Sequence, residues 1–410
     1  MALDLHRMNK ILEVNDKHHY AVVEPGVTFI DLYNYCVEHN KKVWPSTASV
    51  GWGSVVGNTL DRGMGFGQNF AHHQCMAGIE VMLADGDVVR TGQFGISNSP
   101  SAFLSKFTYG PSIDGLLFQS NLAVVTKLSL WLTPQPQAFM ACHFSVPLFR
   151  DLPVLVDTLS VLKRNGTLPA NQVVWFTSLI ETLCIAGRRS DYWTGPGPIP
   201  DWRLEELREQ TGHGHWFARW GLYGPARIVR AQFEEISAVL AAACPTGTIS
   251  GKLFAETAPG AGVDAAAVPT EHGGMFVGKP ELWSLPLIEW AIPRGKKEGK
   301  PAHGDYAPVI PSDGARVMEW MEVSKQVCEE GGVELMADFF MYERHVVCMN
   351  MFTWDQTDEG QKRAVERVFY GLHDKARERG YGMYRAHVNH MGECVFPLSV
   401  LWWAGTDVQG

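Results

Sequence analysis

The segment that most constrains the fold of this chain is SVGWGSVVGNTLDRG, residues 49–63, in which glycines stand at positions 51, 53, 57 and 63. Glycine costs backbone entropy on folding, so a run this dense is tolerated where φ is positive or where another group comes close to the backbone. The spacing is not the G-x-G-x-x-G fingerprint, and no strand–turn–helix unit surrounds it, which argues against a nicotinamide-binding Rossmann site. Two interpretations stay open on these residues alone: a tight loop with close backbone packing, and a ligand-binding loop.

The composition is that of an ordinary globular protein, with 46% hydrophobic and 19% charged residues in a chain of 410. A net charge of −9 argues against nucleic acid as a partner, because phosphate binding requires a basic face. No stretch approaches the length of a membrane span, and the N-terminus lacks the apolar core of a secretion signal. We therefore expect no nucleic-acid or membrane partner, and an intracellular enzyme in the cytoplasm or in peroxisomes.

The cysteines and histidines give no sign of a metal site. Eight cysteines stand far apart without a C-x-x-C pair, a spacing typical neither of zinc sites nor of disulfide frameworks. Most lie in apolar stretches, so we expect buried free thiols. The histidine pairs at 18–19, 72–73 and 213–215 have no H-E-x-x-H pattern or carboxylate at ligand spacing, which favours structural or solvent-facing roles. A G-x-S-x-G elbow of serine hydrolases is also absent from the sequence.

The first third of the chain is predicted to mix strands and helices. In YAVVEPGVTFIDLYNYC a short apolar strand ends at a Pro-Gly pair, and Thr28 can cap a helix in which Asp31 completes a capping box. GIEVMLADGDVVRTG predicts a hairpin with its turn at Asp85-Gly86. The β-branched run LAVVTKLSLWLTP predicts a long strand that Pro134 stops, so we place a domain boundary in TPQPQ, after residue 136.

The middle of the chain alternates amphipathic helices with loops rich in Gly and Pro. Helices are predicted in FRDLPVLVDTLSVLKRNG, PARIVRAQFEEISAVLAAAC, DGARVMEWMEVSKQVCEEGG and EGQKRAVERVFYGLHDKARERGYG. Between the last two, VELMADFFMYERHVVCMNMF predicts a strand-rich hairpin. Helices laid against an antiparallel sheet would form a separate α+β cap domain over residues 137–380.

Two further positions are candidates for chemistry. His345 lies in the apolar strand MYERHVVCMNMF, where it is either a satisfied core residue or a covalent anchor for a cofactor that faces the strand. Tyr384 and Arg385 follow a glycine break in GYGMYRAH. Such a pair can bind an anionic oxygen through a hydrogen bond and a positive charge, or can simply be the exposed start of a strand.

Several segments together resemble the vanillyl-alcohol oxidase and 4-cresol methylhydroxylase family. They are YAVVEPGVTFIDLYNYC, GSVVGNTLDRGMGF, GIEVMLADGDVVRTG and YGPSIDGLLFQSNLAVVTKLSLWL, followed by LYGPARIVR, ERHVVC and GYGMYRAH. They occur in the family's order over nearly the whole chain, which is more specific than any single motif. The resemblance implies an FAD-binding domain of the PCMH type over residues 1–136, the cap domain, and a segment over residues 381–410 that returns towards the flavin.

The resemblance also implies roles for individual residues, with FAD as the cofactor. It places Gly53, Ser54, Gly57, Asn58 and Arg62 along the cofactor, and Val124 and Val125 near its adenine end. His345 matches the histidine that vanillyl-alcohol oxidase links covalently to the flavin 8α-carbon. Tyr384 and Arg385 match a pair that holds a phenolate substrate and its quinone-methide intermediate. In this chemistry the flavin accepts the hydride, and the protein supplies orientation and charge stabilisation.

Three departures from the family pattern carry consequences. Family oxidases have an active-site aspartate where this chain has Ser49, and a serine cannot act as a carboxylate base. A family tyrosine is replaced by Phe66, which removes one phenolate donor. These changes disfavour para-phenol oxidation and leave hydride transfer from an ordinary alcohol carbon. The chain also starts after the family's pyrophosphate-binding loop and ends early, so we expect truncation at both ends and weak FAD binding.

The sequence therefore predicts an FAD-dependent oxidoreductase that takes a hydride from a small alcohol or phenolic substrate at flavin N5. Its electrons would pass to O₂ or to another acceptor, and the enzyme would form a homo-oligomer. Ser49, Tyr384 and Arg385 are the predicted catalytic residues. The alternative is a non-catalytic relative that has lost FAD and serves as a binding or partner subunit.

Overall fold

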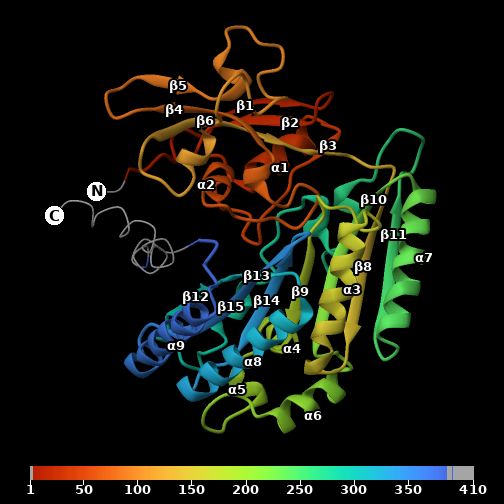
Figure 1. The fold of residues 1–410 in the computed structure, drawn as a ribbon, viewed down its shortest axis with the longest axis vertical. Helices are drawn as coiled ribbons and strands as arrows, with labels where there is room; N and C mark the ends of the chain where they lie inside the picture. Colours follow the sequence, from red (N-terminus) through yellow and green to blue (C-terminus); the bar gives the residue numbers. More distant parts are fainter. Residues whose placement is uncertain (1–2, 386–389, 391–410) are drawn as a thin grey trace, which may run out of the picture.

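The computed structural model of the chain describes residues 3–385 and residue 390. Its strands form two main sheets, drawn one above the other in Figure 1. The smaller sheet takes its strands from the first third of the chain, and the larger one takes strands from residues 138–355. The predicted α+β class with a large antiparallel sheet is confirmed, while the domain boundary after residue 136 stays a prediction.

The smaller sheet has the strand order β1-β2-β6-β4-β5, and its neighbouring strands are antiparallel. Its strands are β1 (Ile11–Asn15), β2 (Tyr20–Val23), β4 (Met76–Met82), β5 (Val88–Arg90) and β6 (Val124–Trp131), and its helices are α1 (Phe29–Glu38) and α2 (Val55–Leu60). The predicted capping box starts α1: the Thr28 hydroxyl accepts from the Asp31 amide at 3.1 Å, and the Asp31 carboxylate accepts from the Thr28 amide at 2.9 Å. The predicted turn after β4 is also present, with Gly86 at a φ of +93°.

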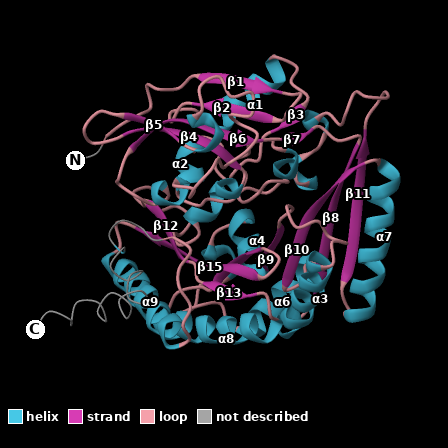
Figure 2. Cartoon of the chain, turned by 45° about the horizontal axis from the view of Figure 1, so that its top comes forward, coloured by secondary structure: helices cyan, strands magenta, loops and turns pink. Residues whose placement is uncertain are grey.

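The larger sheet has the order β11-β8-β10-β9-β14-β15-β12, and β13 pairs with β15. Its strands are β8 (Ala138–Val146), β9 (Val174–Ser178), β10 (Trp216–Gly224), β11 (Thr248–Ala255), β12 (Pro301–Tyr306), β13 (Val309–Pro311), β14 (Met336–Met341) and β15 (His345–Asp355). One face packs against α3 (Leu152–Arg164), α7 (Ala226–Ala243), α8 (Gly314–Gly331) and α9 (Glu359–Glu378), as Figures 1 and 2 show. All four predicted helices are therefore present, and their apolar sides form the main core.

The other face of the larger sheet meets the first third of the chain through aromatic side chains. The Phe66 ring lies 4.8 Å from the Trp175 ring and 5.5 Å from the Phe340 ring, centroid to centroid. The Phe70 ring lies 4.7 Å from Tyr342 in the same way. A two-residue pairing between β3 (Val43–Trp44) and β7 (Thr133–Pro134) lies just before the chain enters β8.

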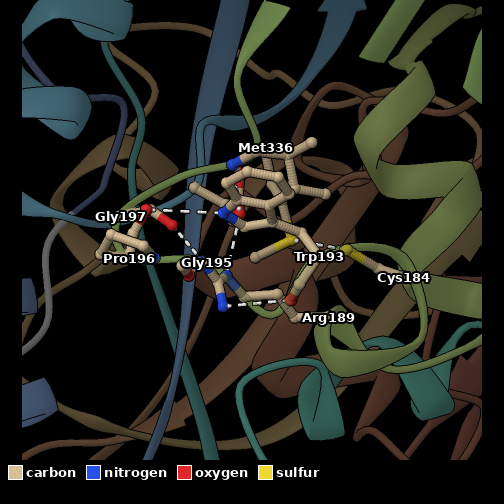
Figure 3. A network of polar contacts seen from close by, with 9 residues as sticks. Cys184, Arg189, Trp193, Gly195, Pro196, Gly197 and Met336 are labelled. Atoms are coloured by element: carbon tan, nitrogen blue, oxygen red, sulfur yellow. Dashed lines mark hydrogen bonds and ion pairs between the residues drawn. The ribbon is translucent and has the colours of Figure 1, made fainter. Parts of the chain in front are cut away.

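Polar contacts join the short helices α4 (Leu179–Ala186) and α5 (Arg189–Tyr192) to neighbouring segments, and α6 (Asp201–Thr211) follows them in the chain. In Figure 3 the Arg189 guanidinium donates to the carbonyl oxygen of Gly195 at 3.0 Å. Its Nε donates to Glu334 Oε1 at 3.2 Å, just before β14. Cys184 Sγ on α4 lies 3.2 Å from Met336 Sδ on β14. The contact between Cys184 and Met336 holds α4 against β14.

The cysteine prediction is confirmed for the seven cysteines that the structure describes, which are all buried free thiols. Cys394 and the C-terminal stretch CVFPLSVLWWAGTDVQG lie outside the described residues. Within residues 3–385 and at residue 390, no helix is long and apolar enough to cross a membrane.

The contact between the two sheet regions gives a stability prediction at Gly278. This residue has a φ of +78°, and an added Cβ would lie 2.1 Å from the Pro45 carbonyl oxygen. A left-handed backbone costs an alanine about 1–2 kcal/mol, and forcing the two segments apart adds about 1–3 kcal/mol. Gly260 has the same φ of +78° with no atom within 4 Å of such a Cβ, so it isolates the backbone cost. We expect Gly278→Ala to lower the free energy of unfolding in urea clearly more than Gly260→Ala, and equal losses would contradict the contact.

Candidate active site

Packing within the chain explains part of the glycine-rich segment. A Cβ at Gly51 would lie 2.7 Å from Pro280 Cβ, and a Cβ at Gly63 would lie 2.3 Å from the Asn58 side chain. Gly53 and Gly57 have more room, since their added Cβ atoms would stand 3.2 Å and 3.4 Å from the nearest atom. Packing therefore explains the glycines at 51 and 63, whereas Gly57 has only ordinary contacts and the ligand-binding interpretation of this segment stays a prediction.

Two polar side chains of this segment form hydrogen bonds with other residues of the chain. Ser54 caps α2, because its hydroxyl accepts from the Gly57 amide at 2.9 Å and donates to the Pro25 carbonyl at 2.6 Å. Asn58 Oδ1 lies 2.6 Å from Nδ1 of His72, whose Nε2 lies 2.9 Å from the Ser46 hydroxyl. The predicted structural role of His72 is confirmed by these bonds and by its complete burial. Burial lowers the pKa of His72 to about 3, so the ring is neutral.

A cavity of about 200 Å³ lies between the glycine-rich segment and the larger sheet. We call it the interface cavity. Ser49, Asn58 and Phe66 line it from the first third of the chain. From the other side it is lined mainly by aromatic and sulfur-containing side chains with a few acids, namely Trp175, Glu181, Met275, Trp283, His303, Asp305, Asp338, Phe340, Met349 and Met351. Tyr384 and Arg385 complete the wall, so all three predicted catalytic residues line one cavity.

Backbone hydrogen bonds hold Tyr384 and Arg385 at the wall of the interface cavity. The Tyr384 amide donates to the Ala307 carbonyl at 3.2 Å, beside β12, and Gln119 donates to the Tyr384 carbonyl at 3.3 Å. Arg385 Nη1 donates to Asp61 Oδ2 at 3.3 Å, at the end of α2. Burial raises the pKa of the Tyr384 phenol well above its usual value, so the phenol stays a neutral hydrogen-bond donor.

The interface cavity also contains carboxyl groups that the sequence analysis missed. Asp338 on β14 and Glu181 on α4 are 7% and 3% exposed. Trp175 Nε1 donates to Asp338 Oδ2 at 3.3 Å. Burial, with the negative charge of Asp305, raises the pKa of Asp338 to about 7. The signal in the sequence was a lone acid in the otherwise apolar strand MADFFM, since a buried carboxyl group is costly unless it has a role.

The structure does not bring the remaining predicted residues into the interface cavity. His345, at the start of β15, stacks on Tyr342 with ring centroids 4.2 Å apart. Both line a second cavity of about 340 Å³, here called the His345 pocket, together with Gln74 and Cys75. Other predicted cofactor residues lie elsewhere: Arg62 is exposed with a φ of +53°, and Val124 and Val125 pair with Met82 and Val81 in the smaller sheet.

The groups near the two cavities fit the flavin that the resemblance implies. His73 Nδ1 is buried and has no hydrogen-bond partner within the described residues. Burial lowers the pKa of His73 to about 4, with the nearby charges of Arg62 and Lys106 adding to the effect. A neutral imidazole with an unpaired nitrogen suits a heteroaromatic ring that carries donors and acceptors. Gly57 would allow such a ring to approach the backbone.

Comparisons with known proteins identify relatives of this chain. Residues 1–92 match the family model described as "FAD binding domain". The chain is 30% identical over 388 residues to the 4-cresol dehydrogenase [hydroxylating] flavoprotein subunit of Pseudomonas putida, covering 94% of this chain and 71% of that protein.

Two solved structures match most of this chain. The 4-ethylphenol oxidase from Gulosibacter chungangensis, in an isoeugenol complex, matches with a TM-score of 0.85 and 26% identity over 95% of this chain and 73% of that one. The p-cresol methylhydroxylase structure with bound substrate matches with a TM-score of 0.87 and 29% identity, over 97% of this chain and 74% of that one.

The raised pKa of Asp338 gives a prediction for stability against pH. An unfolded aspartate titrates near a pKa of about 4, whereas folded Asp338 keeps its proton up to about 7. Between these values the folded state binds more protons, so the free energy of unfolding falls as pH rises, by up to about 1.4 kcal/mol per pH unit. We expect Asp338→Asn to make this slope shallower in denaturant titrations at several pH values. Asp85→Asn, in the exposed turn after β4, should keep the wild-type slope. The same slope in wild type and Asp338→Asn would contradict the assignment.

Proposed function

We propose that this chain, which belongs to the vanillyl-alcohol oxidase and 4-cresol methylhydroxylase family of FAD-linked oxidoreductases, oxidises para-substituted phenols. The observation that carries the proposal is the interface cavity, which joins Tyr384 and Arg385 to the buried carboxyl group of Asp338 beside the glycine-rich segment. One end of the cavity thus has groups for a phenol oxygen, and another wall has a group that can exchange a proton. The relatives named for 4-cresol and 4-ethylphenol support the same substrate class.

Tyr384 and Arg385 are proposed to hold the phenol oxygen. The neutral Tyr384 hydroxyl donates a hydrogen bond, and the Arg385 guanidinium supplies the positive charge that a phenolate requires. The bond from Arg385 to Asp61 fixes the position of the guanidinium and leaves its other N–H groups for the substrate. Because the arginine is always charged, the pair would favour the phenolate over the neutral phenol.

The walls of the interface cavity suit a single flat ring. Phe66, Phe340 and Trp283 present aromatic faces and edges, and Met349 and Met351 are polarizable and adaptable. A volume of about 200 Å³ suits a small monocyclic molecule. The apolar side chains of the wall lower the local polarity, which strengthens the attraction between Arg385 and a phenolate.

Asp338 supplies the carboxyl group that Ser49 lacks. The phenol releases its proton to solvent when it binds as the phenolate beside Arg385. FAD, when bound, would accept the hydride from the benzylic carbon of this phenolate, which thereby becomes a neutral quinone methide. A water molecule can then add to that carbon: the C–O bond forms, one water proton passes to the Asp338 carboxylate, and the phenolate charge returns beside Arg385. A carboxylate with a pKa near neutrality suits this transfer. The expectation that the serine disfavours phenols is therefore replaced by a proposal in which Asp338 is the base.

Reduction of the bound flavin tests the proposed function. We expect anaerobic 4-cresol or 4-ethylphenol to bleach the flavin absorbance of the purified holoenzyme. Their methyl ethers, which cannot form a phenolate, should leave it unchanged. Arg385→Ala should slow the bleaching by about 100-fold at an unchanged flavin content, because one charged oxyanion partner is lost. A protein that binds no flavin, or a flavin that no phenol reduces, would instead support the non-catalytic alternative.

The electron acceptor is a separate part of the proposal. One relative is named a dehydrogenase and another an oxidase. O₂ and a protein or artificial acceptor therefore both stay candidates for this chain. Rates measured with O₂ alone and with an added one-electron dye distinguish them.

We further propose that His345 is the covalent anchor of the flavin. His345 is half-buried and lines the His345 pocket. The charge of His345 is one of the causes that lower the pKa of His73. Burial lowers the pKa of His345, so the imidazole is neutral and its nitrogen is available as a nucleophile.

Denaturing gels test the covalent bond. We expect the wild-type band to fluoresce in acid, and His345→Ala to lose this fluorescence while keeping dissociable FAD. Tyr342→Phe, which changes the phenol stacked on His345, should keep it. Loss of fluorescence in Tyr342→Phe alone would make the neighbouring phenol the anchor, and a dark wild-type band would exclude a covalent bond.

A further inference from the structure

Glu181 is a second buried acid of the interface cavity that the proposed chemistry leaves unused. It lies in the first turn of α4 and is 3% exposed. Its Oε2 atom is buried without a hydrogen-bond partner in the part of the chain that the structure describes, and so is Asp338 Oδ1. Both residues line the interface cavity. Two carboxyl groups thus share one small space, each with an unsatisfied oxygen.

The surroundings of Glu181 do not supply a full countercharge. Burial and the negative charge of Asp338 raise the pKa of Glu181 well above its usual value, and the positive charge of Arg219 on β10 opposes this. The Arg219 guanidinium lies 5.0 Å from the centre of the Trp175 ring, whose Nε1 donates to Asp338. Trp175 therefore links the arginine to one carboxyl group without an ion pair.

The other titratable groups near Glu181 are few. Asp305 and His303 on β12 line the same cavity, as do Tyr384 and Arg385. Cys184 lies one turn further along α4, and burial raises the pKa of its thiol well above the usual value. Among these, only Arg219 and Arg385 carry a positive charge at all working pH values. Arg385 already donates to Asp61.

We propose that Glu181 is a second acid–base group of the active site and that Glu181 and Asp338 together hold one proton in the resting enzyme. Two negative charges in one apolar cavity repel strongly, so the second ionisation of such a pair is suppressed. Two neutral acids would leave no base for the chemistry. The state with one proton, held on Glu181, leaves Asp338 ionised and able to accept.

This inference rests on the proposed function for its chemical role. When a water molecule adds to the substrate, Asp338 takes up one of its protons and the pair passes from one proton to two. Both carboxyl groups of the pair are then neutral, so the pair adds no negative charge to that of Asp305 near the phenolate product held by Arg385. Loss of the proton from Asp338 to solvent restores the resting state. Glu181 would thus keep the Glu181–Asp338 pair from carrying two negative charges beside an anionic ligand.

Infrared spectroscopy of the resting holoenzyme tests the shared proton without any substrate. In mildly alkaline solution we expect the wild type to keep a carbonyl band of a protonated carboxyl group. Glu181→Gln, which keeps the shape of the side chain, should lose this band. Glu334→Gln is the matched control, because Glu334 is also buried, has Arg189 and the Ile199 amide as partners, and lies outside the interface cavity. The control should keep the band.

The pH profile of phenol oxidation gives a second readout. As the wild type loses the Glu181 proton at high pH, the doubly charged cavity repels the phenolate and kcat/KM falls. Glu181→Gln cannot ionise, so this alkaline limb should move upward by about 1 pH unit or more. A wild type without the infrared band, or a band that persists in Glu181→Gln, overturns the proposal. Absence of phenol oxidation with the band intact overturns only the proposed function.

Discussion

The candidate active site depends on the contact that Phe66 makes with Trp175 and Phe340. Phe66 follows the glycine-rich segment and is 3% exposed, and both partners belong to the larger sheet. An aromatic side chain of this size contributes about 2–3 kcal/mol when it is fully buried, and ring contacts add to this. The contact fixes the distance between the two sheet regions. It thereby sets the width of the interface cavity, which these same rings line.

Burial of individual side chains also determines the charge states near the site. The same exclusion of water that lowers the pKa values of His72 and His73 raises those of Asp338 and Glu181. The histidines become neutral hydrogen-bonding groups, Asp338 exchanges a proton near neutral pH, and the pKa of Glu181 lies well above its usual value. Among the described residues that line the cavity, Arg385 alone carries a permanent positive charge, which suits the binding of an anionic oxygen.

Much of the local structure could be predicted because it depends on neighbouring residues. The capping box of Thr28 and Asp31 and the turn at Gly86 require residues at most three positions apart, and both are present. Asp338 could not be assigned in this way, because its position follows from the pairing of β14 with β9 and β15. Arg385 meets Asp61 across 324 positions of sequence, a separation that no local pattern reports.

The α+β class, the capped helices, the turns and, through collinear segments, the flavoprotein family could be predicted from the amino-acid sequence alone. These follow from short-range backbone preferences and from the order of motifs along the chain. The tertiary structure decided which glycines are required by packing, placed His345 in a pocket separate from Tyr384 and Arg385, and brought Asp338 and Glu181 together. The physical reason is that cavities and pKa values depend on burial by residues distant in the sequence. Burial is a property of the packed sheets and not of any segment alone.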